Sequence, residues 1–105
     1  EKLRQYRKSW NNTDTIRAMC DDYRAAIHFD WAIDKKDRNR CLEIPACVMW
    51  GKTGAMAQHF DVPATWSKNF SNIEKKPMEG GHFFPDQYPQ ETVSALVSFI
   101  FNNIN

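Results

Sequence analysis

The chain has 105 residues, about one small domain, with 42% hydrophobic and 26% charged residues. Its formal net charge is +1, so no global electrostatic field favours nucleic acid or an acidic membrane surface. All apolar runs are far shorter than the roughly 20 residues that a membrane-spanning helix needs. The composition therefore favours a globular protein whose partners are neither nucleic acid nor membrane.

The chain contains three cysteines, Cys20, Cys41 and Cys47, without a CxxC pair. An odd count argues against a disulfide framework and favours a reducing compartment. No stretch resembles a secretory signal peptide, so we expect a cytoplasmic protein. The spacing of these cysteines and of the three histidines matches no zinc signature. We therefore predict no metal site and no cofactor.

The first part of the chain has a helical pattern. Lys2 to Trp10 predicts a short helix, and the sequence NNTDT then breaks it. Thr13 or Asp14 is the predicted N-cap of a second helix, from about Thr15 to about Lys36. Its apolar residues recur at helical spacing and form one stripe: Ile16, Met19, Cys20, Tyr23, Ala26 and Ile27. Tyr23 is on this stripe, so its ring is expected to pack inward.

The middle of the chain predicts two strands. A polar linker, DKKDRNR, precedes Pro45. The continuous apolar run from Ala46 to Trp50 ends at Gly51 and is typical of a strand buried on both faces. Residues 52–69 have a mixed pattern that predicts short helical pieces and loop. Asn72 to Met78 predicts a second, more polar strand.

The segment from Pro89 onward predicts an amphipathic helix that docks one face on an apolar surface. The residues of that face are Val93, Leu96, Val97, Ile100, Phe101 and Ile104. The order of elements is that of the closing portion of an α/β protein. Two strands make a poor sheet, and the chain begins at Glu1 rather than at a methionine. We therefore expect the C-terminal part of a larger chain, or a chain that assembles with a partner.

A histidine, His82, lies in the loop before this helix. Gly80 and Gly81 precede it and allow a sharp turn that presents the imidazole at the carboxyl edge of the sheet. A neutral imidazole there can take a proton from water near neutral pH. A loop histidine that donates to a backbone carbonyl is the alternative, and for the loop taken alone it is the more common case.

The segment GGHFFPDQYPQETVSALVSFI closely resembles the catalytic-histidine loop and final helix of α/β-hydrolase-fold enzymes. Upstream, YRKSW, CDDYRAAIHFDWAIDKKD and IPACVMWGKTGAM resemble the C-terminal half of haloacetate (fluoroacetate) dehalogenases. The resemblance covers essentially the whole chain. It implies that residues 1–38 are the end of a helical cap. Residues 39–105 would be the C-terminal part of the α/β-hydrolase core, incomplete on its own.

The resemblance also implies a mechanism. In this family an aspartate displaces halide from a haloacetate and forms an ester, which water then hydrolyses. By resemblance, His82 is the general base for that water. Tyr23 would bind the leaving halide through its hydroxyl. A tyrosine packed in the core with a satisfied hydroxyl is the alternative for Tyr23.

A glycine, Gly54, occupies the place where many α/β-hydrolases carry the triad acid, in a WGxxD pattern. The haloacetate dehalogenases also lack an acid there. Asp61 or Asp86 could replace it in principle, but neither matches the family pattern. The nucleophile, the acid and the arginines that bind the substrate carboxylate are expected before Glu1. The predicted partners are therefore a haloacetate, water and the N-terminal half of the same enzyme, without which the segment should be inactive.

Two other functions remain open. The chain could belong to an epoxide hydrolase or another α/β-hydrolase, because a cap tyrosine can also donate to an epoxide oxygen. It could also be a truncated, non-catalytic module. Exposed sheet edges and an uncovered helix face would then promote binding of a partner or formation of a homodimer.

Overall fold

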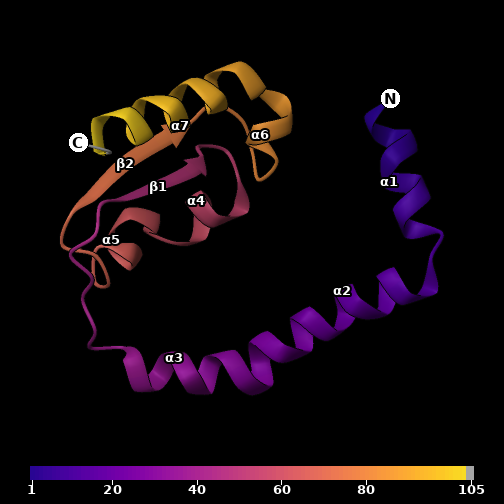
Figure 1. The fold of residues 1–105 in the computed structure, drawn as a ribbon, viewed down its shortest axis with the longest axis horizontal. Coiled ribbons are helices and arrows are strands. Elements are labelled where there is room, and N and C mark those ends of the chain that lie inside the picture. The colour runs from indigo at the N-terminus through magenta and orange to yellow at the C-terminus, as the bar shows by residue number, and fades with distance from the viewer. Residues whose placement is uncertain (104–105) are drawn as a thin grey trace. The chain divides into compact units, whose positions relative to one another are not determined.

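The computed structural model describes residues 1–103 of the chain (Figure 1). The chain divides into two compact units, Glu1–Arg38 and the part that begins at Asn39. The identification of these two units with a helical cap and a hydrolase core stays a prediction. Within the described residues, no helix combines the length and the apolar character needed to cross a membrane.

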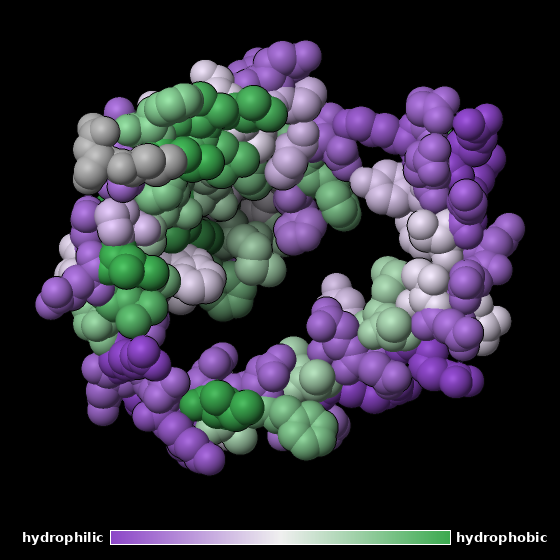
Figure 2. All heavy atoms as spheres, in the orientation of Figure 1, coloured by the Kyte–Doolittle hydropathy of each residue, from purple (hydrophilic) through white to green (hydrophobic). Residues whose placement is uncertain are grey.

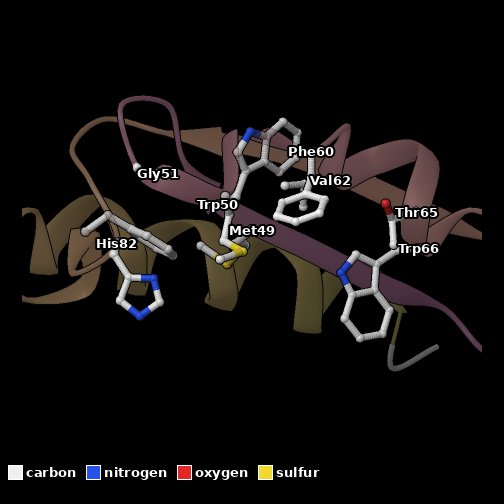
Figure 3. A pocket seen from close by; sticks show the side chains of 11 residues that line it. Met49, Trp50, Gly51, Phe60, Val62, Thr65, Trp66 and His82 are labelled. Atoms are coloured by element: carbon white, nitrogen blue, oxygen red, sulfur yellow. The ribbon is translucent and has the colours of Figure 1, made fainter. Parts of the chain in front are cut away.

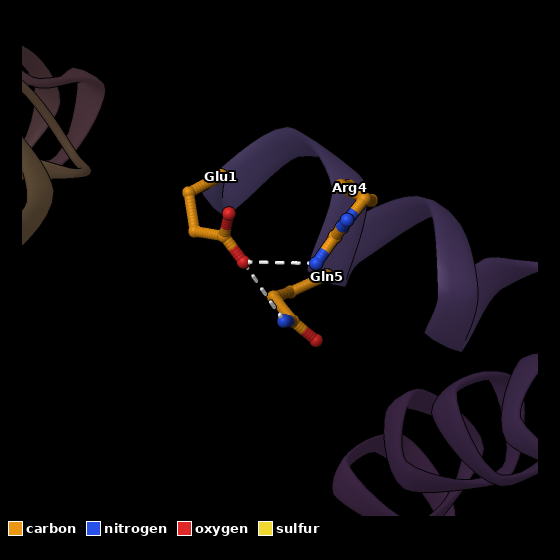
Figure 4. A network of polar contacts seen from close by, with 3 residues as sticks. All are labelled: Glu1, Arg4 and Gln5. Atoms are coloured by element: carbon orange, nitrogen blue, oxygen red, sulfur yellow. Dashed lines mark hydrogen bonds and ion pairs between the residues drawn. The ribbon is translucent and has the colours of Figure 1, made fainter.

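The first unit is helical. Helix α1 (Lys2–Trp10) has the predicted bounds. The carboxylate of Glu1 accepts from Arg4 Nη2 at 3.3 Å and from Gln5 Nε2 at 3.4 Å (Figure 4). Glu1 is therefore linked by its side chain to the first turns of the helix, where an acidic group also complements the helix dipole.

The second helical stretch begins earlier than the sequence predicts. Helix α2 (Thr13–Ala25) has Asn12 as its N-cap, whose side-chain oxygen accepts from the backbone N–H groups of Asp14 at 2.9 Å and Thr15 at 3.3 Å. The predicted caps, Thr13 and Asp14, are therefore wrong. Asparagine is as good a cap as aspartate or serine, and Asn12 precedes both candidates.

A π-helical turn, η1 (Ala26–Asp30), and helix α3 (Trp31–Asp37) continue directly from α2. The predicted linker DKKDRNR therefore begins inside a helix. None of the residues in α1, α2, η1 or α3 is buried, and the side chain of Tyr23 is 75% exposed. The expectation that the Tyr23 ring packs inward is wrong, because this unit offers no apolar layer on which the predicted stripe could pack.

The second unit contains both predicted strands. β1 (Ala46–Gly51) and β2 (Ile73–Met78) pair in parallel, in a register that runs from Ala46 opposite Ile73 to Gly51 opposite Met78. β1 is half-buried rather than buried on both faces, because β2 is its one neighbour in this two-stranded sheet. Helices α4 (Ala55–His59) and α5 (Val62–Trp66) connect the strands, as the mixed pattern predicts.

Two helices follow β2. Helix α6 (Phe84–Gln87) is one turn long, and α7 (Pro89–Asn103) begins with proline, which suits a first helical position. Thr92 is buried, and Ala95 and Phe99 on the same face are half-buried. Met78, the last residue of β2, is also buried, at 8% exposure. The small core of this unit therefore forms where α7 packs against β2 (Figure 1).

The predicted docking face of α7 is not the face that packs. Its members in the described residues are exposed: Val93, Leu96, Val97, Ile100 and Phe101. Ile104 lies outside the described residues. Figure 2 shows apolar atoms, in green, at the surface over α7. The prediction fails because periodicity locates an apolar stripe, whereas the position of β2 decides which stripe is covered.

Candidate functional site

The carboxyl ends of β1 and β2 lie against each other with little space between their backbones. A Cβ atom built on Gly51 would be 2.0 Å from the carbonyl oxygen of Gly81 and 2.7 Å from that of Gly80. Real Cβ contacts do not approach so closely, so position 51 accepts glycine alone in this arrangement. Lys52 N–H donates to Met78 O at 2.9 Å, and Thr53 N–H donates to Gly80 O at 3.1 Å.

The loop after β2 makes the sharp turn predicted from its glycines. Gly80 has φ +95°, a left-handed conformation that other residues rarely adopt. Gly81 N–H donates to the side-chain oxygen Oε1 of Gln87 at 2.9 Å, and Gly81 O accepts from Phe84 N–H at 3.1 Å. This turn presents His82 just beyond the carboxyl ends of two parallel strands, where α/β proteins commonly bind ligands.

His82 itself is exposed, and its imidazole meets the ring of Phe83 edge-on, with centroids 5.0 Å apart. Gly54, in the turn after β1, is close to it. A Cβ on Gly54 would lie 3.0 Å from the backbone nitrogen of His82. Glycine at position 54 therefore lets the turn after β1 approach the histidine loop.

A cavity of about 500 Å³ lies beside His82 in the second unit. Its walls include Met49, Trp50, Phe60, Val62, Trp66 and Phe84. Figure 3 shows the imidazole of His82 at one end and the indole of Trp66 at the other. Trp66 thus lines the cavity, while the centroid of its ring also lies 6.3 Å from that of Phe70. Small-molecule sites commonly have this size and an apolar lining with few polar groups.

Tyr23, the predicted halide-binding residue, is in α2 of the first unit, whereas His82 is in the second. Its ring is exposed within the described part of the chain. Each of the two residues is placed within its own unit, and the role of Tyr23 in halide binding stays a prediction.

Charged groups flank the strands of the second unit. Lys52 and Glu79 form an ion pair between the residues that follow β1 and β2. On the strands, Glu74 pairs with Lys76 at 2.9 Å and lies opposite Cys47 in the register. Burial raises the pKa of the Cys47 thiol, and the Glu74 carboxylate raises it further, while Lys76 acts in the other direction.

Sequence reasoning missed Gln87. A glutamine five residues after His82 carries no recognised motif, and its contact with Gly81 depends on the turn of α6. Among residues 1–103, no group of three or more histidine, cysteine or acidic side chains is arranged to hold a metal ion.

No protein-family model matches the chain. The chain is 35% identical over 100 residues to a fluoroacetate dehalogenase from Burkholderia sp, a match that covers 95% of this chain and 33% of the relative. Its structure superposes with a TM-score of 0.86 on the crystal structure of a provisionally described acyltransferase from Salmonella enterica. That match is 29% identical and covers 95% of this chain and 33% of the other. The chain matches one third of each relative.

The chain is therefore homologous to part of an α/β-hydrolase-like protein. Its mixed helices and strands, with a small parallel sheet, match a fragment of the α/β-hydrolase-like fold. The dehalogenase relative supports a hydrolase-like origin for the chain. The two relatives carry different described activities.

Proposed function

We propose that the chain is the C-terminal segment of an α/β-hydrolase that resembles haloacetate dehalogenase. Residues 1–38 would be the end of its cap and residues 39–105 the end of its core. The main support is the position of His82, which a glycine turn presents at the carboxyl ends of two parallel strands beside an apolar cavity. The similarity to the Burkholderia dehalogenase supports the same assignment.

In the proposed reaction, an aspartate supplied by another part of the protein attacks the α-carbon of a haloacetate. Halide leaves with the electron pair of the broken carbon–halogen bond, and an aspartyl ester forms. The hydroxyl of Tyr23 donates to the departing halide. The imidazole of His82 then accepts a proton from water, whose oxygen attacks the ester carbonyl. The bond between the carbonyl carbon and the alkoxide oxygen breaks, and the imidazolium returns the proton to that oxygen, which leaves as hydroxyacetate. Hydrolysis returns the aspartate to its carboxylate form.

An ester or acyl substrate is a second candidate. Among the residues that line the cavity, His82 is the one titratable group, and the walls are mainly apolar and aromatic. A haloacetate carries a carboxylate that needs cationic or hydrogen-bonding partners. In the dehalogenase proposal these partners come from outside the chain, whereas an apolar acyl group would match the cavity walls directly. The acyltransferase description of the Salmonella relative favours the same alternative.

A chimera tests the proposal. This chain would replace the matching third of the Burkholderia dehalogenase, and halide release from fluoroacetate and chloroacetate would be measured. We expect repeated turnover from the chimera. We expect His82→Asn to release about one halide per enzyme and then stop, with the ester detectable by mass spectrometry. His59→Asn is the matched control, because His59 is an exposed histidine of α4 that does not line the cavity, and it should keep full turnover.

Full turnover by His82→Asn would contradict the role of His82. Hydrolysis of an ester or epoxide by a chimera that releases no halide would favour the alternatives. In an active chimera, Tyr23→Phe should slow halide release about tenfold or more, since one hydrogen bond to the leaving group is lost, and should leave ester hydrolysis unchanged. An unchanged rate of halide release would remove Tyr23 from the mechanism.

A further inference from the structure

The side chain of Gln87 reaches back across the histidine loop. Its Oε1 atom accepts from Gly81 N–H at 2.9 Å, although the two residues are six positions apart. The backbone of Gln87 is held in turn, because its N–H donates to Phe83 O at 3.1 Å and it closes the single turn of α6. The side chain thus connects a helical residue directly to the peptide next to His82.

Gln87 and its neighbour Tyr88 also close over Gly80. A Cβ built on Gly80 would lie 2.5 Å from Gln87 Oε1 and 2.9 Å from the ring of Tyr88. On the β1 side, Thr53 N–H donates to Gly80 O at 3.1 Å. A backbone donor in the turn after β1 therefore binds Gly80, and a side-chain acceptor at the end of α6 binds Gly81.

We propose that Gln87 is the positioning residue of His82. The proposal rests on the proposed function, in which His82 is the general base. The His82 side chain is exposed within the described chain, so the backbone of its loop decides where the imidazole lies. The Gln87 amide oxygen holds the Gly80–Gly81 peptide, one peptide before His82, and an amide keeps this hydrogen bond at every pH near neutrality. A displacement of about 1 Å at a reacting group can cost a factor of roughly 10² in rate.

Two substitutions at position 87 separate the hydrogen bond from the shape of the side chain. Gln87→Met has a similar length but no oxygen acceptor, and Gln87→Glu keeps an acceptor oxygen. Gln90→Met, on the exposed first turn of α7, is the matched control. In the ¹⁵N-labelled 105-residue chain, we expect Gln87→Met to speed amide exchange of Gly81 about five- to tenfold. In Gln87→Met, the amides of β1 should exchange at the same rates as in the unmodified chain. In Gln87→Glu and in Gln90→Met, the Gly81 amide should also exchange at its unmodified rate.

An unchanged Gly81 exchange rate in Gln87→Met would overturn the proposal. So would an equal acceleration at Gly81 and throughout β1, because it would show that Gln87 supports the fold rather than the loop.

The chimera then tests the catalytic consequence. Since His82 acts after the ester has formed, Gln87→Met should slow ester hydrolysis about tenfold and leave both the first release of halide and kcat/KM unchanged. Gln87→Glu should restore most of the rate. Equal slowing of both steps, or no slowing of hydrolysis, would contradict a positioning role. If His82→Asn keeps full turnover, the proposed function fails; if His82→Asn stops turnover and Gln87→Met does not slow hydrolysis, the positioning role alone fails.

Discussion

The two units of this chain use apolar side chains in different ways. Residues 1–38 form helices whose large apolar residues, such as Ile27 at 71% exposure and Trp31 at 62%, remain on the surface. From Asn39 onward, a parallel strand pair and α7 bury Met78 and Thr92 at 8% exposure each. A helical stripe alone therefore creates no core. The buried part of this chain forms where the backbones of non-adjacent segments come close together.

The interactions that hold the two units differ in the same way. In the first unit they are local along the helices: the Asn12 cap, the Asp21–Arg24 ion pair, and Lys35 Nζ at 5.1 Å from the ring of Trp31. In the second unit they join residues far apart in sequence, such as Thr53 and Gly80. Substitutions in the first unit should therefore act locally, whereas a substitution that separates these distant segments should act throughout the second unit.

The largest expected effect is that of Gly51→Ala. The added methyl group would overlap the Gly81 carbonyl, a backbone atom that cannot move without separating β1 from the histidine loop. We expect the free energy of unfolding of the second unit to fall by about 3 kcal/mol, measured by chemical denaturation with β1 amide signals as the probe. Signals from α2 should not change.

Gly81→Ala is the matched control for this substitution. A Cβ there would meet the Thr53 hydroxyl at 3.9 Å, an ordinary contact, and Gly81 does not have a positive φ. It should therefore leave stability nearly unchanged. Equal stabilities for the two variants would show that the close approach does not hold the second unit together.

A smaller effect is expected for Asn12→Ala in the first unit. Loss of the side-chain acceptor leaves the N–H groups of Asp14 and Thr15 without their cap, at a cost of about 1 kcal/mol. Amide exchange at these two positions should accelerate about fivefold, while the β1 amides should not respond. Asn12→Asp keeps an acceptor and should behave like the unmodified chain. Faster exchange of the β1 amides in Asn12→Ala would show that the cap of α2 also stabilises the second unit, against the difference between the units described above.

The smallest effect concerns the thiols. Cys20 is exposed on α2, whereas Cys47 is half-buried on β1 and has a raised pKa. A raised pKa leaves less thiolate at pH 8, so we expect iodoacetamide to modify Cys47 about threefold more slowly than Cys20. The difference should narrow as the pH rises through the pKa of Cys47, and vanish in denaturant. Equal rates in the folded chain would contradict the assigned environment of Cys47.

The predictions that succeeded concern elements with local signals. α1 was predicted with its bounds, β1 follows from a continuous apolar run, and β2 falls within the predicted polar strand Asn72 to Met78, where Pro77 suits an edge or a strand end. The N-cap of α2 was misplaced by one or two residues, because Asn12, Thr13 and Asp14 are all capable caps. The sharp turn at Gly80 was expected from two consecutive glycines.

The sequence by itself determined α1, the helical character of α7, the two strands and the turn of the histidine loop, since periodicity and glycines act over a few residues. Only the tertiary structure decided which face of α7 covers β2 and why Gly51 admits no side chain. It also decided that Gln87 binds the peptide beside His82. These features depend on the positions of segments that are far apart in the sequence, and residue type alone does not predict the distances between such segments.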